Sequence, residues 1–215
     1  MADLNFQLHQ LPQRFACVNP KRHWMRGLTL VELLVAISIA AILGSLAAPA
    51  LTSFVSRNAV RALSGDFTMS LQRARAEAIN RNQCVVMCLS SDPTAANPRC
   101  ATTGNNWNVG WVIYVEPTCT GDDALDSTAE ATAAVAAGRL VYAKESVETR
   151  YNLIPSPASR VILFNARGVS GLSGAASFNI ADSYASTADQ NKYGRTLCFD
   201  KTGRVRSVAY LGSCS

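Results

Sequence analysis

The chain has 215 residues, enough for one domain plus an appendage, and much of its 48% hydrophobic content lies between Leu28 and Val55. Charged residues make up only 16%, against roughly 25% in an average domain. This composition indicates a membrane segment joined to a fairly neutral soluble domain and excludes an evenly spread apolar core. The net charge of +5 is also uneven, because residues 116–148 carry −5 and residues 150–215 carry +5. That asymmetry indicates a basic face near the C-terminus or, as the open alternative, an ordinary solvated surface.

The N-terminus contains a polar, basic segment followed by an apolar one. Residues 1–27 end in Arg26-Gly27, and residues 28–51 then carry a single charge, Glu32. A helix of this length spans a bilayer, and the flanking bases are expected to stay in the cytoplasm. An ordinary secretory signal would instead end in small residues after its apolar stretch. We therefore expect three parts: a leader at 1–27, a transmembrane and assembly helix at 28–56, and a soluble domain at 57–215.

Glu32 is the informative residue of the apolar segment. A carboxylate inside a membrane helix is costly and indicates a function. If the chain is cut after Gly27, Glu32 is close to the new N-terminus and can pair with the N-terminal amine of an adjacent subunit, which neutralises both charges. The alternative is a plain signal anchor with a stray glutamate.

Beyond Val55 the pattern predicts a continued helix and then strands. Phe67, Leu71, Ala74 and Ala78 form an apolar stripe at helical spacing. Residues 121–137 are expected to form a long loop or a short helix. The predicted strands are 84–89, 111–115, 139–143, 161–164, 177–180, 196–200 and 205–211. The fold class is therefore α+β.

Seven cysteines are present, of which Cys17 lies in the leader. The even number in an exported domain favours disulfides over a metal site, and both histidines lie in the leader. Six cysteines allow 15 pairings. The short loops favour Cys198 with Cys214 and Cys100 with Cys119. Cys84 and Cys88 share a strand face, so each is expected to pair elsewhere or with a neighbour.

The N-terminal pattern resembles a known export signal. Arg26-Gly27 followed by Leu28-Thr29-Leu30-Val31-Glu32 is similar to the class III leader of type IV pilins and type II secretion pseudopilins. The resemblance implies that a prepilin peptidase cuts after Gly27 and methylates the amine of Leu28. Most family members have Phe where this chain has Leu28, so cleavage is expected more firmly than methylation.

The rest of the chain resembles the GspH/FimT group of minor pilins and pseudopilins, most closely the FimT type. The residues that carry this resemblance are Phe67, Leu71, Ala74, Arg75, Glu77, Ala78, Ile79, Arg81, Val85, Cys88, Trp107, Gly110, Trp111, Val112, Phe164, Asn165, Gly168, Gly203 and Arg204. The resemblance implies a type IV pilin fold, with a long N-terminal helix packed on an antiparallel β-sheet domain. It also implies a single-pass inner-membrane protein with a periplasmic domain, which joins other pilin subunits in an extracellular filament.

The C-terminal residues predict a β-hairpin with a basic face. Residues 200–203 have turn chemistry, with Gly203 able to take a positive φ. Alternation on the second strand places Arg204 and Arg206 on one face, about 6.8 Å apart. The other bases of this region, Lys201 in the turn with Lys192 and Arg195 before it, would be auxiliary contacts. Two guanidinium groups on a rigid edge suit salt-sensitive binding of the DNA phosphate backbone.

The motif Gly203-Arg204-Val205-Arg206 also matches the Gly-Arg-x-Arg motif of FimT-type pilins, which are associated with DNA uptake in natural transformation. The alternative is a structural minor pilin or pseudopilin, at a tip or in priming, whose arginines meet an acidic surface of a neighbouring subunit. No catalytic motif, cofactor site or metal-ligand cluster is found in the sequence, so an enzyme is not expected.

Overall fold

The structure is a computed structural model that describes residues 27–120, 125–146, 149–171 and 176–214, apart from the side chain at position 49. Its contacts divide the chain into residues 1–45 and residues 46–215. Helix α1 (Leu30–Arg81) belongs to both parts. It begins after Thr29, whose side-chain oxygen accepts a hydrogen bond from the Glu32 backbone N–H at 3.2 Å, as an N-cap residue does. In the described residues α1 is the one helix long and apolar enough to cross a membrane.

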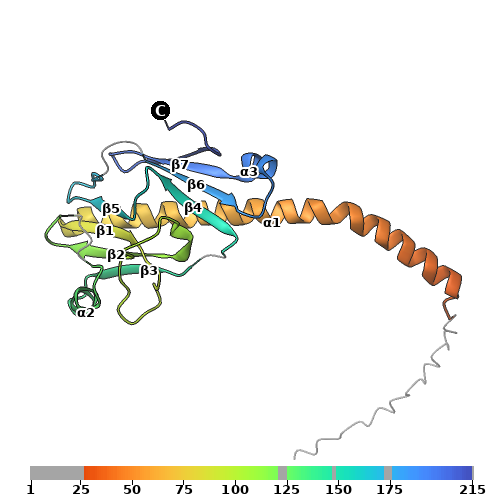
Figure 1. The fold of residues 1–215 in the computed structure, drawn as a ribbon, viewed down its shortest axis with the longest axis horizontal. Helices are drawn as coiled ribbons and strands as arrows, with labels where there is room; N and C mark the ends of the chain where they lie inside the picture. The colour runs from red at the N-terminus through yellow and green to blue at the C-terminus, as the bar shows by residue number, and fades with distance from the viewer. Residues whose placement is uncertain (1–26, 121–124, 147–148, 172–175, 215) are drawn as a thin grey trace, which may run out of the picture. The chain divides into compact units, whose positions relative to one another are not determined.

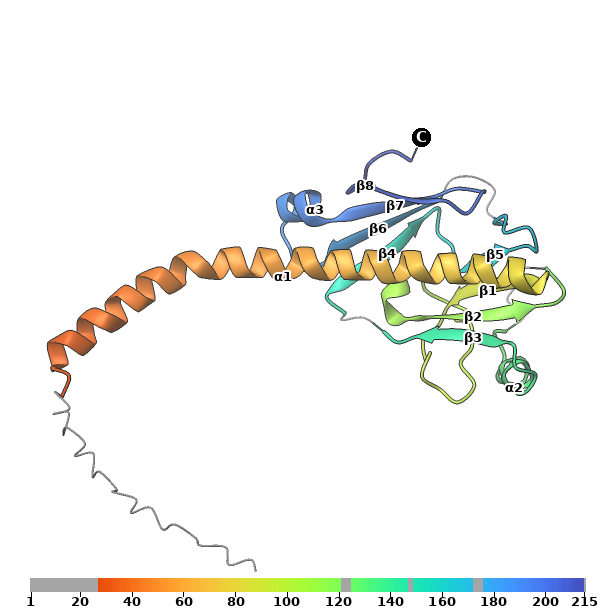
Figure 2. The same ribbon diagram turned by 180° about the vertical axis from the view of Figure 1, so that it is seen from behind.

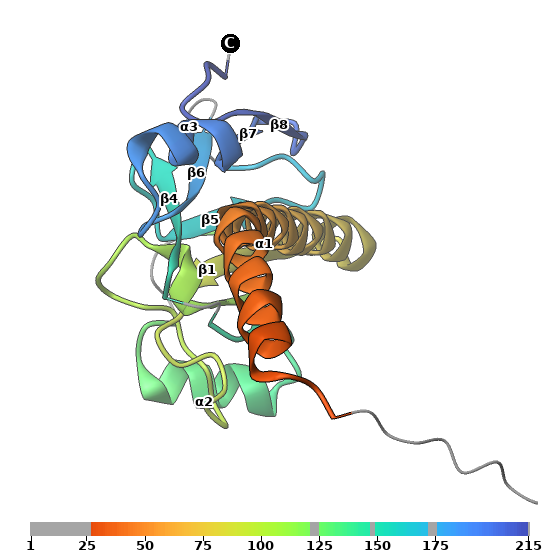
Figure 3. The same cartoon turned by 90° about the vertical axis from the view of Figure 1, so that its right-hand side faces the viewer.

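Residues 46–215 contain two antiparallel four-stranded sheets. Sheet A has the order β3-β2-β1-β5 and sheet B the order β4-β6-β7-β8. The strands of sheet A are β1 (Cys84–Leu89), β2 (Trp111–Glu116), β3 (Leu140–Lys144) and β5 (Val161–Phe164), and those of sheet B are β4 (Tyr151–Ser156), β6 (Ala176–Asp182), β7 (Arg195–Phe199) and β8 (Val205–Ala209). The chain crosses between the sheets before β4, before β5 and before β6. In Figures 1 and 2 the sheets lie side by side along the C-terminal half of α1, and Figure 3 shows this half of the helix beside both.

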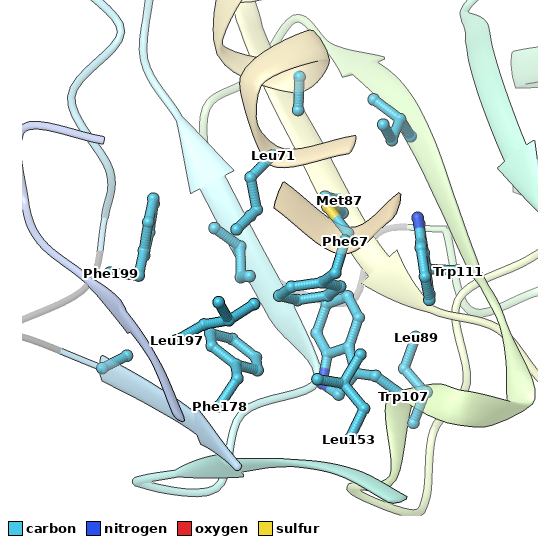
Figure 4. Packing of buried hydrophobic residues seen from close by; sticks show 14 of the residues in the cluster. Phe67, Leu71, Met87, Leu89, Trp107, Trp111, Leu153, Phe178, Leu197 and Phe199 are labelled. Carbon is cyan, nitrogen blue, oxygen red and sulfur yellow. The ribbon is translucent and has the colours of Figure 1, made fainter. Parts of the chain in front are cut away.

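The main core lies between α1 and the two sheets. The predicted stripe of Phe67, Leu71, Ala74 and Ala78 is buried there, with each residue at most 1% exposed. Figure 4 shows the Phe67 ring among aromatic side chains from both sheets and the intervening 3₁₀ turn (Trp107–Val109). Its centroid lies 5.5, 5.3 and 4.7 Å from those of Trp107, Trp111 and Phe178. One helical face thus joins sheet A to sheet B through apolar burial.

The outer face of sheet A carries a second, smaller core beneath α2 (Thr128–Ala136). Ser127 and Glu130 form a capping box at the start of this helix, which explains why the Ala/Thr-rich segment becomes helical there. Tyr114 lies in this core and donates its hydroxyl to the Pro98 carbonyl. Burial raises the pKa of Tyr114 to about 12, so its hydroxyl stays protonated. Because both faces of sheet A are covered, every residue of β1 and β2 is buried.

A buried carboxylate ties α1 to the end of β6. Asp182 accepts hydrogen bonds from Ser56 Oγ on α1 at 3.0 Å and from Arg150 Nε at 2.7 Å. Burial raises the pKa of Asp182, but the hydrogen bonds from Arg150, the Tyr184 backbone N–H and Ser56 outweigh it. The net result is a pKa below the ordinary value of 3.8, so the ion pair with Arg150 is present at neutral pH.

The observed elements confirm the α+β fold class and the expected long N-terminal helix on antiparallel sheets, including the C-terminal hairpin β7–β8. Strands 84–89 and 161–164 have the predicted bounds, and the segment 121–137 contains α2 rather than only a loop. The sequence interpretation missed β4 and α3 (Thr187–Tyr193).

One disulfide prediction is wrong. Cys198 is bonded to Cys214, as the short loop predicted, but Cys100 is bonded to Cys88 and not to Cys119. Cys119 is bonded to Cys84. The reason is the position of Cys84 and Cys88, four residues apart on one face of β1, where each meets a different loop that folds back over sheet A.

Candidate nucleic-acid interface

The hairpin β7–β8 is closed by a turn that its own side chains hold. Asp200 Oδ1 accepts hydrogen bonds from the Thr202 backbone N–H at 2.9 Å, the Thr202 hydroxyl at 2.6 Å and the Arg204 backbone N–H at 3.0 Å. The Thr202 hydroxyl, followed by the other donors, lowers the pKa of Asp200 below its ordinary value. Gly203 has φ +76°, the positive value that the sequence predicted. The conformation of the turn is therefore fixed by hydrogen bonds.

Three bases lie at this turn, and we call Lys201, Arg204 and Arg206 the basic turn. All three are exposed. Arg206 lies on β8 opposite Cys198, so it is on the sheet face that also carries the Cys198–Cys214 disulfide. Arg204 lies just before β8, which begins at Val205. Among the described residues, none of the salt bridges involves Lys201 or Arg204.

The other two predicted contacts lie elsewhere. Arg195 is opposite Ala209 in β8 and Ile180 in β6, which places it at the far end of the hairpin and on the opposite sheet face from Arg206. Its Nη1 donates to the Gly194 carbonyl at 3.0 Å. Lys192 is in the last turn of α3, and its Nζ lies 5.1 Å from the Tyr193 ring centroid. Figure 2 shows α3 and the hairpin turn at opposite ends of β7.

The α3 end forms a separate basic group around Tyr193. Arg57 on α1 lies over the same ring at 5.0 Å, and hydrogen bonds from Lys192, Ser53 and Arg57 lower the pKa of Tyr193. Arg75 is the residue of α1 that touches the hairpin turn. It lies about 27 Å from Arg57 along the helix axis, because an α-helix rises about 1.5 Å per residue. The structure therefore does not bring Lys192 and Arg195 together with the basic turn.

Two further bases, not predicted from the sequence as part of the site, lie at the hairpin turn. Arg75 of α1 is half-buried, and its Nε donates to the Gly168 carbonyl at 3.1 Å. Arg167 is exposed on the loop after β5. That loop is bonded to the hairpin turn, because the Ser170 backbone N–H donates to the Lys201 carbonyl at 3.0 Å. A signal was present in the sequence: Phe164-Asn165…Gly168 and Phe199-Asp200…Gly203 have the same spacing.

The N-terminal predictions fall partly outside the described residues. The leader is not described except for Gly27, which, like Leu28, precedes α1. Glu32 is exposed in the first turn of α1, where a negative charge complements the helix dipole. In the described part of the chain, no group of three or more His, Cys, Asp or Glu side chains could hold a metal ion.

Comparison with known proteins gives two family matches. Residues 64–203 match the family described as type II transport protein GspH. The chain belongs to the GspH family. Residues 25–48 match the prokaryotic N-terminal methylation motif, which covers Gly27, Leu28 and Glu32. Together the two matches make this GspH-family chain a minor pilin or pseudopilin, and they imply processing by prepilin peptidase and assembly with other pilins. A comparison with curated proteins found no match.

Among solved structures, the GspH-family chain is similar to the type IV minor pilin FimU of Pseudomonas aeruginosa. One crystal form has 16% sequence identity and a TM-score of 0.51, and covers 74% of this chain and 97% of FimU. A second crystal form has 17% identity and a TM-score of 0.49, and covers 72% and 99%. The first match establishes the shared fold and no more.

Proposed function

We propose that this minor pilin binds DNA through the basic turn, without sequence preference, for uptake in natural transformation. The observation that supports the proposal is the presentation of Lys201, Arg204 and Arg206 on a turn fixed by Asp200. A guanidinium group can donate two parallel hydrogen bonds to the oxygens of one phosphate. A rigid loop loses little conformational entropy on binding. The match of Gly203-Arg204-Val205-Arg206 to the Gly-Arg-x-Arg motif of FimT-type pilins is the second support.

The net charge of the basic turn is positive, as binding to a phosphate backbone requires. Asp200 is the acid of the turn itself, and its Oδ1 is occupied by backbone and hydroxyl donors. The three bases of the basic turn therefore outnumber it. Lys192 and Arg195, at the far end of the hairpin, would add contacts only to a segment long enough to reach both ends.

We further propose that cleavage after Gly27 leaves Leu28 as the first residue, with residues 28–56 in the membrane or filament core and residues 57–215 outside it. In the filament, Glu32 would pair with the N-terminal amine of a neighbouring subunit. The periplasmic placement of the globular domain before assembly follows from the leader's bases, which favour the cytoplasmic side.

The test is a salt series. The processed chain, extracted from membranes in a neutral detergent, is titrated with a fluorescent short duplex, and the logarithm of the association constant is plotted against that of the salt concentration. Because each phosphate contact contributes about 0.9 to the slope, Arg204→Gln/Arg206→Gln should reduce it by about 2. The matched control Arg61→Gln/Arg99→Gln removes the same charge from exposed positions elsewhere and should leave the slope unchanged.

The second candidate function is a purely structural subunit of a pilus or a type II secretion pseudopilus. The family description as a type II transport protein favours it. It would be adopted if the folded, oxidised wild-type chain failed to bind DNA at low salt. Loss of filaments in Arg204→Gln/Arg206→Gln with DNA binding intact would favour it too.

A further inference from the structure

The loop after β5 and the turn of the β7–β8 hairpin have the same construction. In each, a side-chain oxygen of the residue after a buried Phe accepts backbone N–H groups two and four residues later. The four distances are 2.9 Å (Arg167 to Asn165), 3.1 Å (Val169 to Asn165), 2.9 Å (Thr202 to Asp200) and 3.0 Å (Arg204 to Asp200). Each turn then has a glycine with positive φ, +73° at Gly168 and +76° at Gly203. We call residues 165–169 and 200–204 the paired turns.

The paired turns touch each other although they come from different sheets. Besides the bond between Ser170 and Lys201, the Ser170 hydroxyl donates to the Asp200 carbonyl at 3.4 Å. Beneath them the Phe164 and Phe199 rings meet edge to face at 5.7 Å. The two turns therefore form one continuous surface at the junction of sheets A and B.

Arg75 is the part of α1 on which both turns rest. A Cβ added at Gly168 or at Gly203 would lie 3.0 or 2.9 Å from Arg75 Nε. At Gly168 the added Cβ would also lie 2.7 Å from Ile79 Cδ1, so both glycines allow α1 to approach the turns closely. The Gly168 carbonyl accepts the Arg75 Nε–H. Arg75 thus fixes the position of the two turns relative to each other, and its positive charge lies between them.

Each of the paired turns carries an exposed arginine next to its glycine. Arg167 precedes Gly168 on the sheet A turn, and Arg204 follows Gly203 on the sheet B turn. A Cβ at Gly203 would also be only 3.3 Å from the Gly168 carbonyl oxygen, so the two backbones are adjacent. Among the described residues, none of the salt bridges involves Arg167. Its guanidinium is not committed to a neighbouring carboxylate there.

We propose that Arg167 is a further phosphate contact and that DNA lies across both paired turns, with Arg75 as the positioning residue beneath. This inference rests on the proposed DNA binding. It extends the site from one hairpin of sheet B to the loop of sheet A and divides the backbone contacts between two separate segments of the chain. Non-specific binding becomes stronger and more salt-dependent with each phosphate that is neutralised.

The test uses the processed chain in neutral detergent and the same duplex and salt series. Arg167→Gln should lower the slope by about 0.9, because one phosphate contact is lost. Arg167→Lys keeps the charge and should retain the wild-type slope. The control Arg61→Gln removes one exposed charge from α1, and its slope should match the wild type.

The outcomes separate this inference from the proposed function. A wild-type slope for Arg167→Gln, alongside a reduced slope for Arg204→Gln/Arg206→Gln, would overturn the inference and leave DNA binding in place. Failure of the wild-type chain to bind would overturn both. If Arg167→Gln unfolds, NMR of the wild-type chain decides: a shift of the Arg167 Nε–H signal on addition of duplex supports the contact, and shifts confined to residues 200–206 refute it.

Discussion

At the scale of single residues, the close approach of Arg75 to two glycines makes this corner of the domain intolerant of a methyl group. Gly203 combines a positive φ with a Cβ position 2.8 Å from Arg75 Cδ. Gly138 also has a positive φ, +66°, but nothing lies within 4 Å of its Cβ position. Gly65 lies in α1 with an open Cβ position. Alanine substitutions at these three glycines therefore distinguish the effect of backbone strain on stability from the effect of steric contact.

We expect Gly203→Ala to destabilise the protein more than Gly138→Ala does. The positive φ costs about 1–3 kcal/mol in either variant. The contact with Arg75 should add about 1–3 kcal/mol at position 203 alone. Gly65→Ala should instead stabilise by up to about 1 kcal/mol, since alanine favours the helix. Urea unfolding measures all three, and equal losses at positions 203 and 138 would show that Arg75 moves aside freely.

Asp182 should make stability depend on acid pH. Its pKa in the folded protein is lowered, so the carboxylate contributes stability that is fully present above its unfolded pKa and is lost as the pH falls through the lower folded value. The free energy of unfolding of the wild type should therefore fall below about pH 4. Asp182→Asn should lose this part of the pH dependence and about 1–3 kcal/mol at neutral pH, because Arg150 and the buried Ser56 hydroxyl lose their charged acceptor. If the unfolding free energy of the variant depended on pH as that of the wild type does, the acid sensitivity would come from other carboxylates.

At the scale of elements, the regular patterns were readable and the irregular ones were not. The stripe on α1 and the apolar runs of β1 and β5 have strong periodicity or composition, so sequence alone predicted them. β4 contains Pro155, which argues against a strand in the middle of a sheet but is tolerated here because β4 is at the edge of sheet B. α3 is short and polar, without an apolar period that could have predicted it.

The candidate site likewise has a part that the sequence could predict and a part that it could not. The turn of the hairpin is local, so its residues 200–203 and the neighbouring arginines could be read directly from the sequence. The equal spacing of Phe164-Asn165…Gly168 and Phe199-Asp200…Gly203 was a local signal that the two turns are built alike. That these turns meet each other and Arg75 depends on tertiary contacts between α1, sheet A and sheet B, which no local pattern specifies. The disulfides show a similar limit: Cys88 is only 12 residues from Cys100, but the face of β1 on which it lies decided the pairing.

The disulfide pairing gives a prediction at this scale. In the chain-entropy model, Cys84–Cys119 with its separation of 35 residues should contribute about 4 kcal/mol, against about 3 kcal/mol for Cys198–Cys214 with 16. The variants Cys84→Ala/Cys119→Ala and Cys198→Ala/Cys214→Ala should show this order in urea unfolding. Peptide mapping of the unreduced wild type checks the pairing itself, and a peptide that links Cys100 to Cys119 would contradict the structure.

At the scale of the whole molecule, the N-terminal apolar helix and the pilin fold fit a membrane-anchored subunit whose domain of residues 46–215 carries the candidate interface. Membrane insertion depends on the length and apolarity of α1, whereas entry into a filament depends, in our proposal, on the single charge of Glu32. These two properties can be separated experimentally, because the backbone N–H of residue 32 donates to the Thr29 hydroxyl at the start of α1 whatever the side chain of residue 32 is.

We expect Glu32→Gln to leave the amount of chain in the membrane unchanged and to lower its amount in sheared filaments by more than tenfold. An unpaired charge in an apolar interior costs about 3–5 kcal/mol, and tenfold corresponds to about 1.4 kcal/mol. Immunoblots of the two fractions provide the measurement. Glu130→Gln, on the exposed surface of α2, is the control and should behave as the wild type. Normal incorporation of Glu32→Gln into filaments would refute the proposed pairing of Glu32 with an N-terminal amine.

The distribution of the disulfides also determines how the domain responds to a stretching force. Two of them close loops within sheet A, the third closes one within sheet B, and among the described residues no disulfide joins the two sheets. Under tension the sheets can therefore separate, while the closed loops stay short. In single-molecule pulling, the reduced domain should extend roughly 170 Å further than the oxidised one, since about 3.3–3.6 Å is released per residue. The covalent bonds thus limit how far the domain can lengthen without preventing its two halves from parting.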